Sequence, residues 1–388
     1  MHLKSKTQNR PVKTFSELEL DNNLVSALTS LGLVDLTPIQ SKAIPSILSG
    51  RDLVGIAETG TGKTAAFSLP VLHQLLQNPV ERPVPKTTRS LILAPTRELA
   101  QQIAENIRSY ATHIPFKTTL LYGGVPAKSQ IKSLERGVDM VIATPGRLLD
   151  LFNADKLWLG KVEHFVLDEA DRMLDMGFIR DIQRIASQLP KKRQTLLFSA
   201  TFPKSIANLA NSLLDDPVKV QVARSAKVTD RVEHFLLKVP KDRKRSLLDH
   251  LLKKPELRKV LIFTRTIHGA NKLYKFLTKL EIDAAVIHGN KAQNTRKKAI
   301  ETFKSGTVRV LVATDIAARG IDIEDITHVI NYDIPTDPDS YIHRIGRTGR
   351  ASGNGIAYSF LSENDDKHLD AIERLLAQKI PLEKNHPF

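Results

Sequence analysis

The stretch LVGIAETGTGKT, residues 53–64, decides the fold, because it reads as a β-strand, a glycine-rich turn and the start of a helix. The glycines let backbone N–H groups turn inward around phosphate oxygens, and a helix N-terminus adds positive potential. Lys63 is expected to pair with the β- and γ-phosphates of a nucleotide, and Thr64 to hold Mg²⁺. The candidate ATP-binding residues of this loop are Ala57, Glu58, Thr59, Gly60, Thr61, Gly62, Lys63 and Thr64. A glycine-rich turn without a nucleotide is the alternative, and Gly-Lys-Thr in this setting disfavours it.

Short apolar runs alternate with helical patterns on both sides of this stretch. The strand-like runs are Leu53–Ala57, Ser90–Ala94, Thr118–Tyr122, Met140–Ala143, His164–Leu167 and Thr195–Phe198, then Val260–Thr264, Ala284–Ile287, Val308–Ala313, His328–Asn331 and Ile356–Phe360. Amphipathic segments such as Arg97–Tyr110 and Ile267–Lys279 lie between them. This alternation predicts parallel sheets with crossover helices, and 388 residues exceed the usual size of one core. We therefore expect two tandem doubly wound parallel-sheet α/β domains.

A basic segment, Pro217–Arg231, separates the two halves and loses the clear alternation. We place a linker at 223–230, an ATP-binding domain at 15–222 and a C-terminal domain at 231–384. Residues 385–388 are expected to form a short tail. The basic residues 1–14 are expected to form another, for which disorder is favoured over a role in retaining RNA.

The composition narrows the classes of function. The absence of cysteine excludes disulfides, thiolate metal sites and cysteine nucleophiles, and it fits a reducing cytosol. No apolar stretch approaches the roughly 18 residues that span a membrane, and the N-terminus lacks a secretory signal. We therefore expect a cytoplasmic protein without membrane contact. The net charge of +15 favours a polyanionic partner, nucleic acid first, although surface lysines that only maintain solubility are the alternative.

Asp168-Glu169-Ala170-Asp171 follows an apolar strand directly. An acidic residue that leaves a buried strand beside a phosphate loop commonly holds Mg²⁺ on ATP. Asp168 is expected to act through the metal, partly via water, and Glu169 to orient and deprotonate the attacking water. Such acidic clusters are also found as solvated turns or helix caps, but the position after a strand favours catalysis.

His343–Arg350, HRIGRTGR, is a basic segment of the second half. Phosphoryl transfer places charge on the γ-phosphate oxygens, and an arginine finger neutralises that charge. Arg347 and Arg350 are three residues apart, so they would project the same way if the segment were helical. The alternative is a basic surface loop that binds nucleic acid nonspecifically.

Polar clusters fall just after most of the strands in both halves. Ligands of open parallel sheets bind outside the carboxyl ends of the strands. One edge of each domain is thus expected to carry the functional groups, with ligands between two such edges.

Together these motifs resemble the DEAD-box RNA helicases of superfamily 2, from about Phe15 to Pro381. The resemblance rests on the phosphate loop with its leading Ala57, on Asp168–Asp171, on Ser199-Ala200-Thr201 and on His343–Arg350. Within the family, RMLDMGF at 172–178, FTRTIHGAN at 263–271 and IHGN at 287–290 are most similar to the bacterial RhlE-type group. Glu58 and Asn290 differ from the residues of many members. The resemblance implies two RecA-like domains and an RNA-stimulated ATPase that separates short RNA duplexes or remodels RNA–protein complexes.

The resemblance also implies roles around the nucleotide. Gln40, in TPIQ at 37–40, is expected to read adenine, whose donor–acceptor edge an amide matches. Phe15 would supply an apolar wall, although a core aromatic is equally consistent. Asp322 would contact the ribose or the finger arginines. The residues expected to couple ATP state to domain closure are Asp171, Ser199, Thr201 and His343, although the hydroxyls also suit helix caps.

For RNA, the resemblance implies positions in both domains. They are Pro95, Thr96, Arg97, Gly123, Gly124, Thr144, Pro145, Gly146 and Arg147 in the first, and Arg265, His288, Gly289, Gln293, Arg296 and Thr314 in the second. Glycines and small hydroxyls allow a close approach to sugar and phosphate, and arginines supply charge. Such contacts read 2′-hydroxyls and backbone shape rather than base identity. Taken singly, the arginines would more often be ordinary surface charges.

Three other functions are consistent with parts of this pattern. An ATP-gated RNA clamp with little unwinding would use the same residues. A DNA helicase is disfavoured by the resemblance alone. A non-catalytic binding module would lack Lys63, Glu169 or Arg347, and all three are present. We expect a monomeric core, and the sequence names no protein partner.

Overall fold

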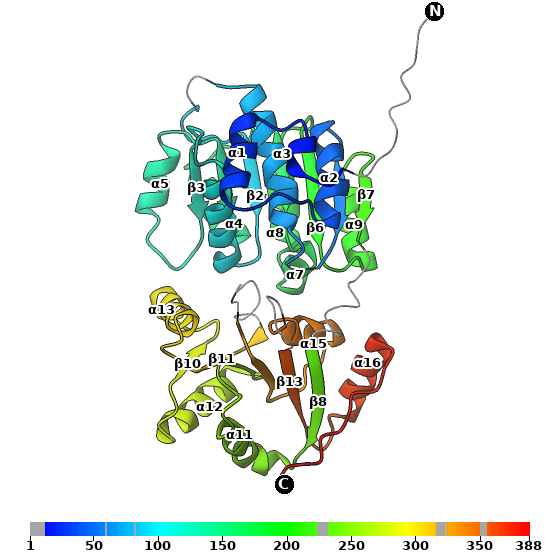
Figure 1. The fold of residues 1–388 in the computed structure, drawn as a ribbon. Coiled ribbons are helices and arrows are strands. Elements are labelled where there is room, and N and C mark those ends of the chain that lie inside the picture. The colour runs from blue at the N-terminus through cyan, green and yellow to red at the C-terminus, as the bar shows by residue number, and fades with distance from the viewer. Residues whose placement is uncertain are drawn as a thin grey trace, which may run out of the picture. The chain divides into compact units, whose positions relative to one another are not determined.

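A computed structural model of the chain divides into two compact units, residues 1–224 and 225–388, each built around one parallel sheet (Figure 1). The structure describes residues 12–58, 60–80, 83–222, 232–315, 323, 325–349 and 355–388. The predicted linker, most of the predicted basic tail, Thr59, Asp322 and Arg350 lie outside the described residues, as does the side chain of Gln293.

The first unit has a seven-stranded sheet in the order β3-β4-β2-β5-β6-β1-β7, with every pair parallel. Its strands are β1 (Leu53–Ile56), β2 (Ser90–Leu93), β3 (Thr118–Leu121), β4 (Met140–Ala143), β5 (His164–Leu167), β6 (Gln194–Ser199) and β7 (Val218–Gln221). Its helices are η1 (Phe15–Glu17), α1 (Asn22–Ser30), α2 (Pro38–Leu48), α3 (Lys63–Gln77), α4 (Arg97–Tyr110), α5 (Lys128–Leu134), α6 (Pro145–Asn153), α7 (Ala170–Asp175), α8 (Ile179–Ala186) and α9 (Lys204–Leu213).

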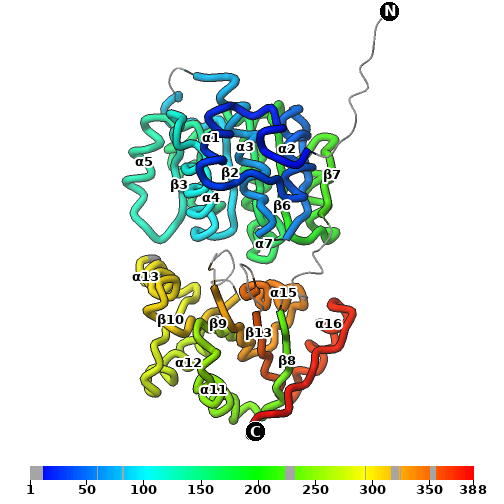
Figure 2. The backbone as a smooth tube through the Cα atoms, viewed as in Figure 1, coloured from blue at the N-terminus to red at the C-terminus, as the bar shows by residue number. Residues whose placement is uncertain are grey.

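The second unit has a six-stranded sheet in the order β10-β11-β9-β12-β13-β8, again parallel throughout. Its strands are β8 (Val232–Lys238), β9 (Val260–Phe263), β10 (Ala284–Ile287), β11 (Val310–Ala313), β12 (His328–Asn331) and β13 (Gly355–Leu361). Its helices are η2 (Lys241–Arg243), α11 (Lys244–Leu252), α12 (Ile267–Lys279), α13 (Gln293–Lys304), α15 (Pro338–Ile345) and α16 (Asp366–Leu376). Figure 2 traces the chain through both units in sequence order.

These two sheets confirm the predicted fold class, and α4 and α12 begin and end where the amphipathic pattern predicts. The sequence pattern did not predict β7 and β8, each of which is the last strand of its sheet. Val218–Gln221 is therefore a strand, although the surrounding segment was predicted to lose the alternation. An edge strand needs little apolar sequence, and in β7 only Val220 is buried.

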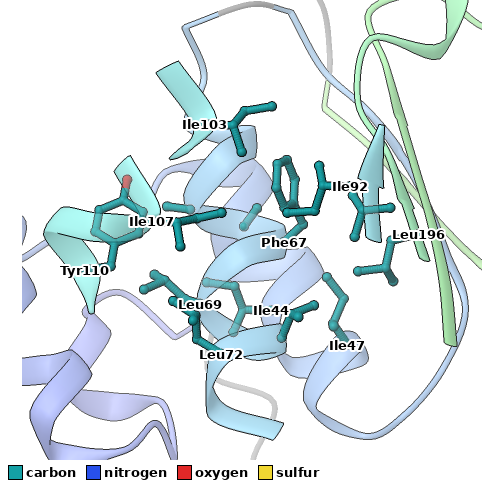
Figure 3. Close-up of a cluster of buried hydrophobic side chains, with 14 of the residues drawn as sticks. Ile44, Ile47, Phe67, Leu69, Leu72, Ile92, Ile103, Ile107, Tyr110 and Leu196 are labelled. Carbon is teal, nitrogen blue, oxygen red and sulfur yellow. The ribbon is translucent and has the colours of Figure 1, made fainter. Parts of the chain in front are cut away.

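One hydrophobic cluster fixes the helix that follows the phosphate loop (Figure 3). Its labelled members are Ile44 and Ile47 of α2, Phe67, Leu69 and Leu72 of α3, Ile92 and Leu196 of the sheet, and Ile103, Ile107 and Tyr110 of α4. The rings of Phe67 and Phe198 lie 5.4 Å apart between centroids. Burying one such large apolar side chain stabilises the fold by about 1.5–3 kcal/mol. The first turn of α3 is therefore held at a fixed place beside the sheet.

None of the described helices is long and apolar enough to cross a bilayer.

Candidate functional site

The strand order of the first sheet separates two groups of predicted residues. The phosphate loop follows β1, Asp168–Asp171 follow β5, and Ser199–Thr201 lie at the end of β6, and these three strands are neighbours. Arg97, Gly123–Gly124 and Thr144–Arg147 follow β2, β3 and β4, which are also neighbours. Since all strands are parallel, their carboxyl ends share one edge. The predicted ATP residues therefore lie along one half of that edge and the predicted RNA residues along the other half.

The phosphate loop connects β1 to α3, and two of its glycines require glycine. Gly60 and Gly62 have φ values of +82° and +87°, a region that other residues rarely adopt. Lys63 is the first residue of α3 and is buried, and its Nζ has no hydrogen-bond partner among the described residues. A buried ammonium without an acceptor is unfavourable. The loop therefore fits an anion at the N-terminus of α3, where backbone N–H groups also point outward.

Gln40 uses its amide to join the start of α2 to the phosphate loop. Its Oε1 accepts a hydrogen bond from the backbone N–H of Thr37 at 2.8 Å, and its Nε2 donates one to the carbonyl of Gly62 at 3.1 Å. A side chain at position 62 would clash with this amide. An amide has two donor hydrogens and two acceptor lone pairs, so one of each remains. The predicted contact with adenine would use that remaining capacity.

Phe15 lies in the same hydrophobic cluster as α3 and is 3% exposed. Its backbone N–H donates to the carbonyl of Val34 at 3.0 Å, which ties η1 to the segment before α2. This burial fits the alternative reading of Phe15, that of an aromatic residue of the core. A contact of Phe15 with adenine stays a prediction.

Asp168 follows β5 and is 2% exposed. Burial raises the pKa of its carboxyl to about 6, and nearby Lys63 opposes the rise. Its Oδ1 accepts a hydrogen bond from the backbone N–H of Glu169 at 2.9 Å. A buried carboxylate close to a buried ammonium is suited to a metal-bound phosphate, because carboxylate oxygen is a preferred Mg²⁺ ligand.

The raised pKa of Asp168 gives a pH-dependent stability. A carboxyl whose pKa is higher in the folded state binds more protons folded than unfolded, so the protein loses stability as the pH rises through about 6. Asp168→Asn removes that cost, and we expect its melting temperature without nucleotide to exceed wild type by several degrees at pH 7.5 and by little at pH 4.5. Thermal unfolding at both pH values measures this. Asn at the exposed Asp155 is the control, and an equal gain at both pH values would contradict the prediction.

Glu169 caps α7 with a left-handed backbone, φ 52° and ψ 52°, which non-glycine residues rarely adopt. Its Oε2 accepts a hydrogen bond from Nη1 of Arg172 at 2.7 Å, and both side chains are buried. The sequence interpretation gave Arg172 no role. The signal was its position three residues after Glu169, which places the two on one face of a helical turn. The predicted base thus has a fixed position and a charged neighbour.

Asp171 connects the acidic motif to the end of β6. Its Oδ2 accepts hydrogen bonds from the backbone N–H of Ala200 at 3.2 Å and of Thr201 at 2.9 Å, and from the Thr201 hydroxyl at 2.9 Å. In return, the N–H of Asp171 donates to Oγ of Ser199 at 3.2 Å. The structure therefore brings together three of the four residues predicted to couple ATP state to domain closure.

The loop after β3 is held between two arginines of the first unit. Gly124 has a φ of +76°, and a side chain there would clash with the guanidinium of Arg97. Arg147 donates from Nη2 to the carbonyl of Val125 at 3.1 Å. Thr96 and Thr144 precede α4 and α6 as N-cap residues, and a Cβ at Gly146 would meet open space. Of the predicted RNA residues of this unit, Gly124 and Gly146 are thus exposed and lie near the two arginines, whereas Pro95, Thr96 and Pro145 are buried.

In the second unit, the predicted RNA residues follow the neighbouring strands β10, β11 and β9. His288 is buried, and its Nε2 lies 3.1 Å from Oδ1 of Asn271. Burial, then Lys291 and Arg296, lower the pKa of His288 below its ordinary value. Arg265 donates from Nη2 to the carbonyl of Ile334 at 3.0 Å. Arg265 is thus bound within its own unit, while Thr314 lies at the end of β11.

Arg347 lies in a turn after α15, which ends at Ile345. Arg347 is therefore not helical. The three-residue spacing from Arg350 thus gives no reason to expect that the two arginines project the same way. The Nε of Arg347 donates to the carbonyl of His343 at 3.2 Å, and its side chain is buried.

Comparison with known proteins agrees with these motifs. Residues 37–209 match the DEAD/DEAH box helicase family, and residues 243–352 match the helicase conserved C-terminal domain. The chain is 42% identical over 370 residues to the ATP-dependent RNA helicase CshA of Listeria monocytogenes, covering 94% of this chain and 69% of that protein. It is also 42% identical to the DEAD-box ATP-dependent RNA helicase 30 of Arabidopsis thaliana, over 95% of this chain and 63% of that protein.

Solved structures give the same similarity. The chain matches S. cerevisiae Dbp5 bound to RNA and ADP BeF3 with a TM-score of 0.84 and 32% identity, covering 95% of this chain and 96% of that one. A DEAD box protein from the hyperthermophile Methanococcus jannaschii has a TM-score of 0.53 and 38% identity, with coverage of 96% and 99%. None of these relatives decides the RhlE-type subgroup, which stays a prediction.

Proposed function

This chain belongs to the DEAD-box family of ATP-dependent RNA helicases, and from this premise we propose how its own residues bind ATP, hydrolyse it and hold RNA. The observation that carries the proposal is the pair of buried groups at one sheet edge, the Lys63 ammonium and the Asp168 carboxylate. Lys63 binds the β- and γ-phosphates, which supply the hydrogen-bond acceptors that its Nζ lacks among the described residues. Gln40 and Phe15 contact adenine, and Asp322 contacts the ribose or the arginines.

Oxygen ligands at this edge support a Mg²⁺ site. The hydroxyl of Thr64 and the carboxylate of Asp168, partly through water, would hold the ion, which would neutralise phosphate charge. Among the described residues no three His, Asp or Glu side chains form a metal site by themselves. That finding fits a metal that shares its ligands with ATP and water.

Hydrolysis requires a base and positive charge at the γ-phosphate. We propose that Glu169 orients the attacking water and accepts its proton. Arg347 and Arg350 neutralise the charge that builds on the γ-phosphate oxygens. Asp171, Ser199, Thr201 and His343 transmit the nucleotide state to RNA binding. The hydrogen bonds between Asp171 and Ser199–Thr201 support the first part of this path.

We propose that the chain recognises the sugar–phosphate backbone and the shape of RNA rather than its base sequence. The surface around Gly123–Gly124, with Arg97 and Arg147, contacts sugar and phosphate of a single strand. Arg265, His288, Gly289, Gln293, Arg296 and Thr314 act likewise in the second unit. ATP and RNA bind cooperatively, and the bound strand bends so that its duplex partner leaves.

A strand-displacement assay tests this proposal. We expect the chain to separate a short RNA duplex only with ATP and Mg²⁺, and to leave a matched DNA duplex intact because recognition depends on the 2′-hydroxyl and on A-form shape. Labelled strands resolved on a gel give the rate. Displacement of both duplexes at equal rates would indicate a DNA helicase. A long dwell time on single strands without displacement would indicate an ATP-gated clamp.

Several proposals concern the chain as a whole. The division into compact units at residues 224 and 225 supports a linker at 223–230 between domains at 15–222 and 231–384. We also propose a monomeric core and a cytoplasmic location, as the cysteine-free composition suggests.

A further inference from the structure

By volume, Arg344 is the largest fully buried side chain in the part of the chain that the structure describes, although the functional scheme above does not use it. It lies on α15 between Tyr341 and Arg347, and 2% of it is exposed. Its Nε and Nη2 donate to the two carboxylate oxygens of Asp315 at 2.6 and 2.7 Å. Two parallel hydrogen bonds of this kind are the strongest and most directional form of ion pair.

The guanidinium of Arg344 is also fixed on its other sides. Its Nη1 donates to Oδ1 of Asn331 at 3.1 Å and to the carbonyl of Asp333 at 2.7 Å. Its centre lies 5.0 Å from the ring centroid of Phe263. Asn331 in turn donates to Oγ of Ser359 at 3.0 Å. The side chain therefore contacts residues at the carboxyl ends of β11, β9 and β12, and Asn331 extends this network to β13.

The two partners of this ion pair lie next to residues with different predicted tasks. Asp315 directly follows Thr314, a predicted RNA contact at the end of β11. Arg344 directly follows His343 and precedes Arg347, which acts on ATP in the proposed function. Because hydrogen bonds of 2.6–2.7 Å weaken when stretched by roughly 0.5 Å, a displacement of Asp315 is transmitted to the end of α15.

Stability alone is a weak explanation for this pair. Arg344 is buried and Asp315 is partly exposed, so their attraction is offset by the cost of removing the guanidinium and part of the carboxylate from water, and apolar residues often replace such a pair without loss. A directional link between the residue after β11 and the end of α15, in contrast, cannot be replaced by apolar contact.

We propose that Arg344 and Asp315 are positioning residues that couple RNA binding at Thr314 to the placement of Arg347. This inference rests on the proposed roles of Thr314 and Arg347. A shift of Thr314 on RNA binding moves Asp315. The two parallel hydrogen bonds between Asp315 and Arg344, which form a fork, transmit that shift to the end of α15. The pair thereby contributes to RNA stimulation of ATP hydrolysis.

The test separates coupling from stability by a double variant. Arg344→Met and Asp315→Leu should each lower the melting temperature, because the first leaves the partly exposed Asp315 carboxylate without this partner and the second leaves the buried Arg344 guanidinium without its carboxylate, the larger loss of the two. Together they should regain most of that loss, yet the ratio of RNA-stimulated to basal ATPase should stay about 5- to 150-fold below wild type, the usual range of allosteric coupling. RNA affinity without nucleotide, measured by filter binding, should change far less than RNA stimulation, because neither Arg344 nor Asp315 is among the residues proposed to contact RNA.

Two further variants keep the test decisive. Arg344→Lys preserves the charge but not the fork, so it should lower RNA stimulation even if the double variant fails to fold. The control is Arg89→Met with Glu163→Leu, a fork of 2.6 and 2.9 Å at the amino ends of β2 and β5, which should keep RNA stimulation. Full stimulation in the double variant or in Arg344→Lys would overturn the inference. Absence of RNA stimulation in wild type would instead overturn the proposed function.

Discussion

Replacing Glu169 with Gln is expected to lower the RNA-stimulated turnover number for ATP by about 10²–10⁴-fold, the usual contribution of a general base. Gln has nearly the same shape but cannot accept a proton at neutral pH. The amide also loses the ion pair with Arg172, whose Nη1 lies 2.7 Å from Oε2 of Glu169. Because the phosphate loop and the RNA surface do not involve this carboxylate, ATP and single-stranded RNA should still bind.

Steady-state ATPase measurements at saturating RNA, together with ATP and RNA titrations, measure these effects. Glu105→Gln makes the same change at an exposed site on α4 and should leave turnover intact. Turnover of Glu169→Gln at the wild-type rate would refute the role of Glu169 as the base. Loss of ATP binding in the same variant would show that Glu169 is structural.

Replacing Lys63 with Met is expected to weaken ATP binding by about 10- to 150-fold, from the 1.5–3 kcal/mol that a hydrogen bond to a charged group contributes. The ammonium is buried at the start of α3, and its Nζ has no hydrogen-bond partner among the described residues. A bound phosphate would supply the missing acceptor. Met fills a similar volume without charge, so the ATP-free protein should keep its melting temperature or gain slightly.

A titration with a fluorescent ATP analogue gives the affinity, and thermal unfolding gives the stability. Lys42→Met, at an exposed position of α2, is the control with the same change of side chain. Unchanged nucleotide affinity in Lys63→Met would contradict the assignment of the phosphate loop. A large fall in melting temperature would mean that Lys63 stabilises the fold rather than the ligand.

Much of the fold could be predicted from the sequence because its pattern is local. The amphipathic pattern predicted the bounds of α4 and α12, and continuous apolar runs predicted the buried central strands. The edge strand β7 lacks such a run, since an edge strand is covered on fewer sides, whereas β8 contains Phe235-Leu236-Leu237, a short apolar run that the sequence analysis did not assign to a strand. Their pairing depends on segments distant in sequence, which local periodicity does not reveal.

The candidate site was predictable in its motifs and less so in its contacts. The phosphate loop and Asp168–Asp171 fall together because they follow β1 and β5, on either side of β6. Contacts between distant segments, such as Gln40 with Gly62 and Arg344 with Asp315, have no signal in a single sequence. The sequence left open whether the segment around Arg347 is helical, and the structure places Arg347 in a turn, because α15 ends at Ile345.

The central claim is that arginines of the second unit complete the charge around the γ-phosphate bound by Lys63. Replacing both Arg347 and Arg350 with Ala, and following one round of ATP hydrolysis at saturating RNA, tests it most directly. We predict that this variant binds ATP and RNA yet hydrolyses ATP about 10³- to 10⁵-fold more slowly than wild type. Hydrolysis at the wild-type rate would contradict the claim.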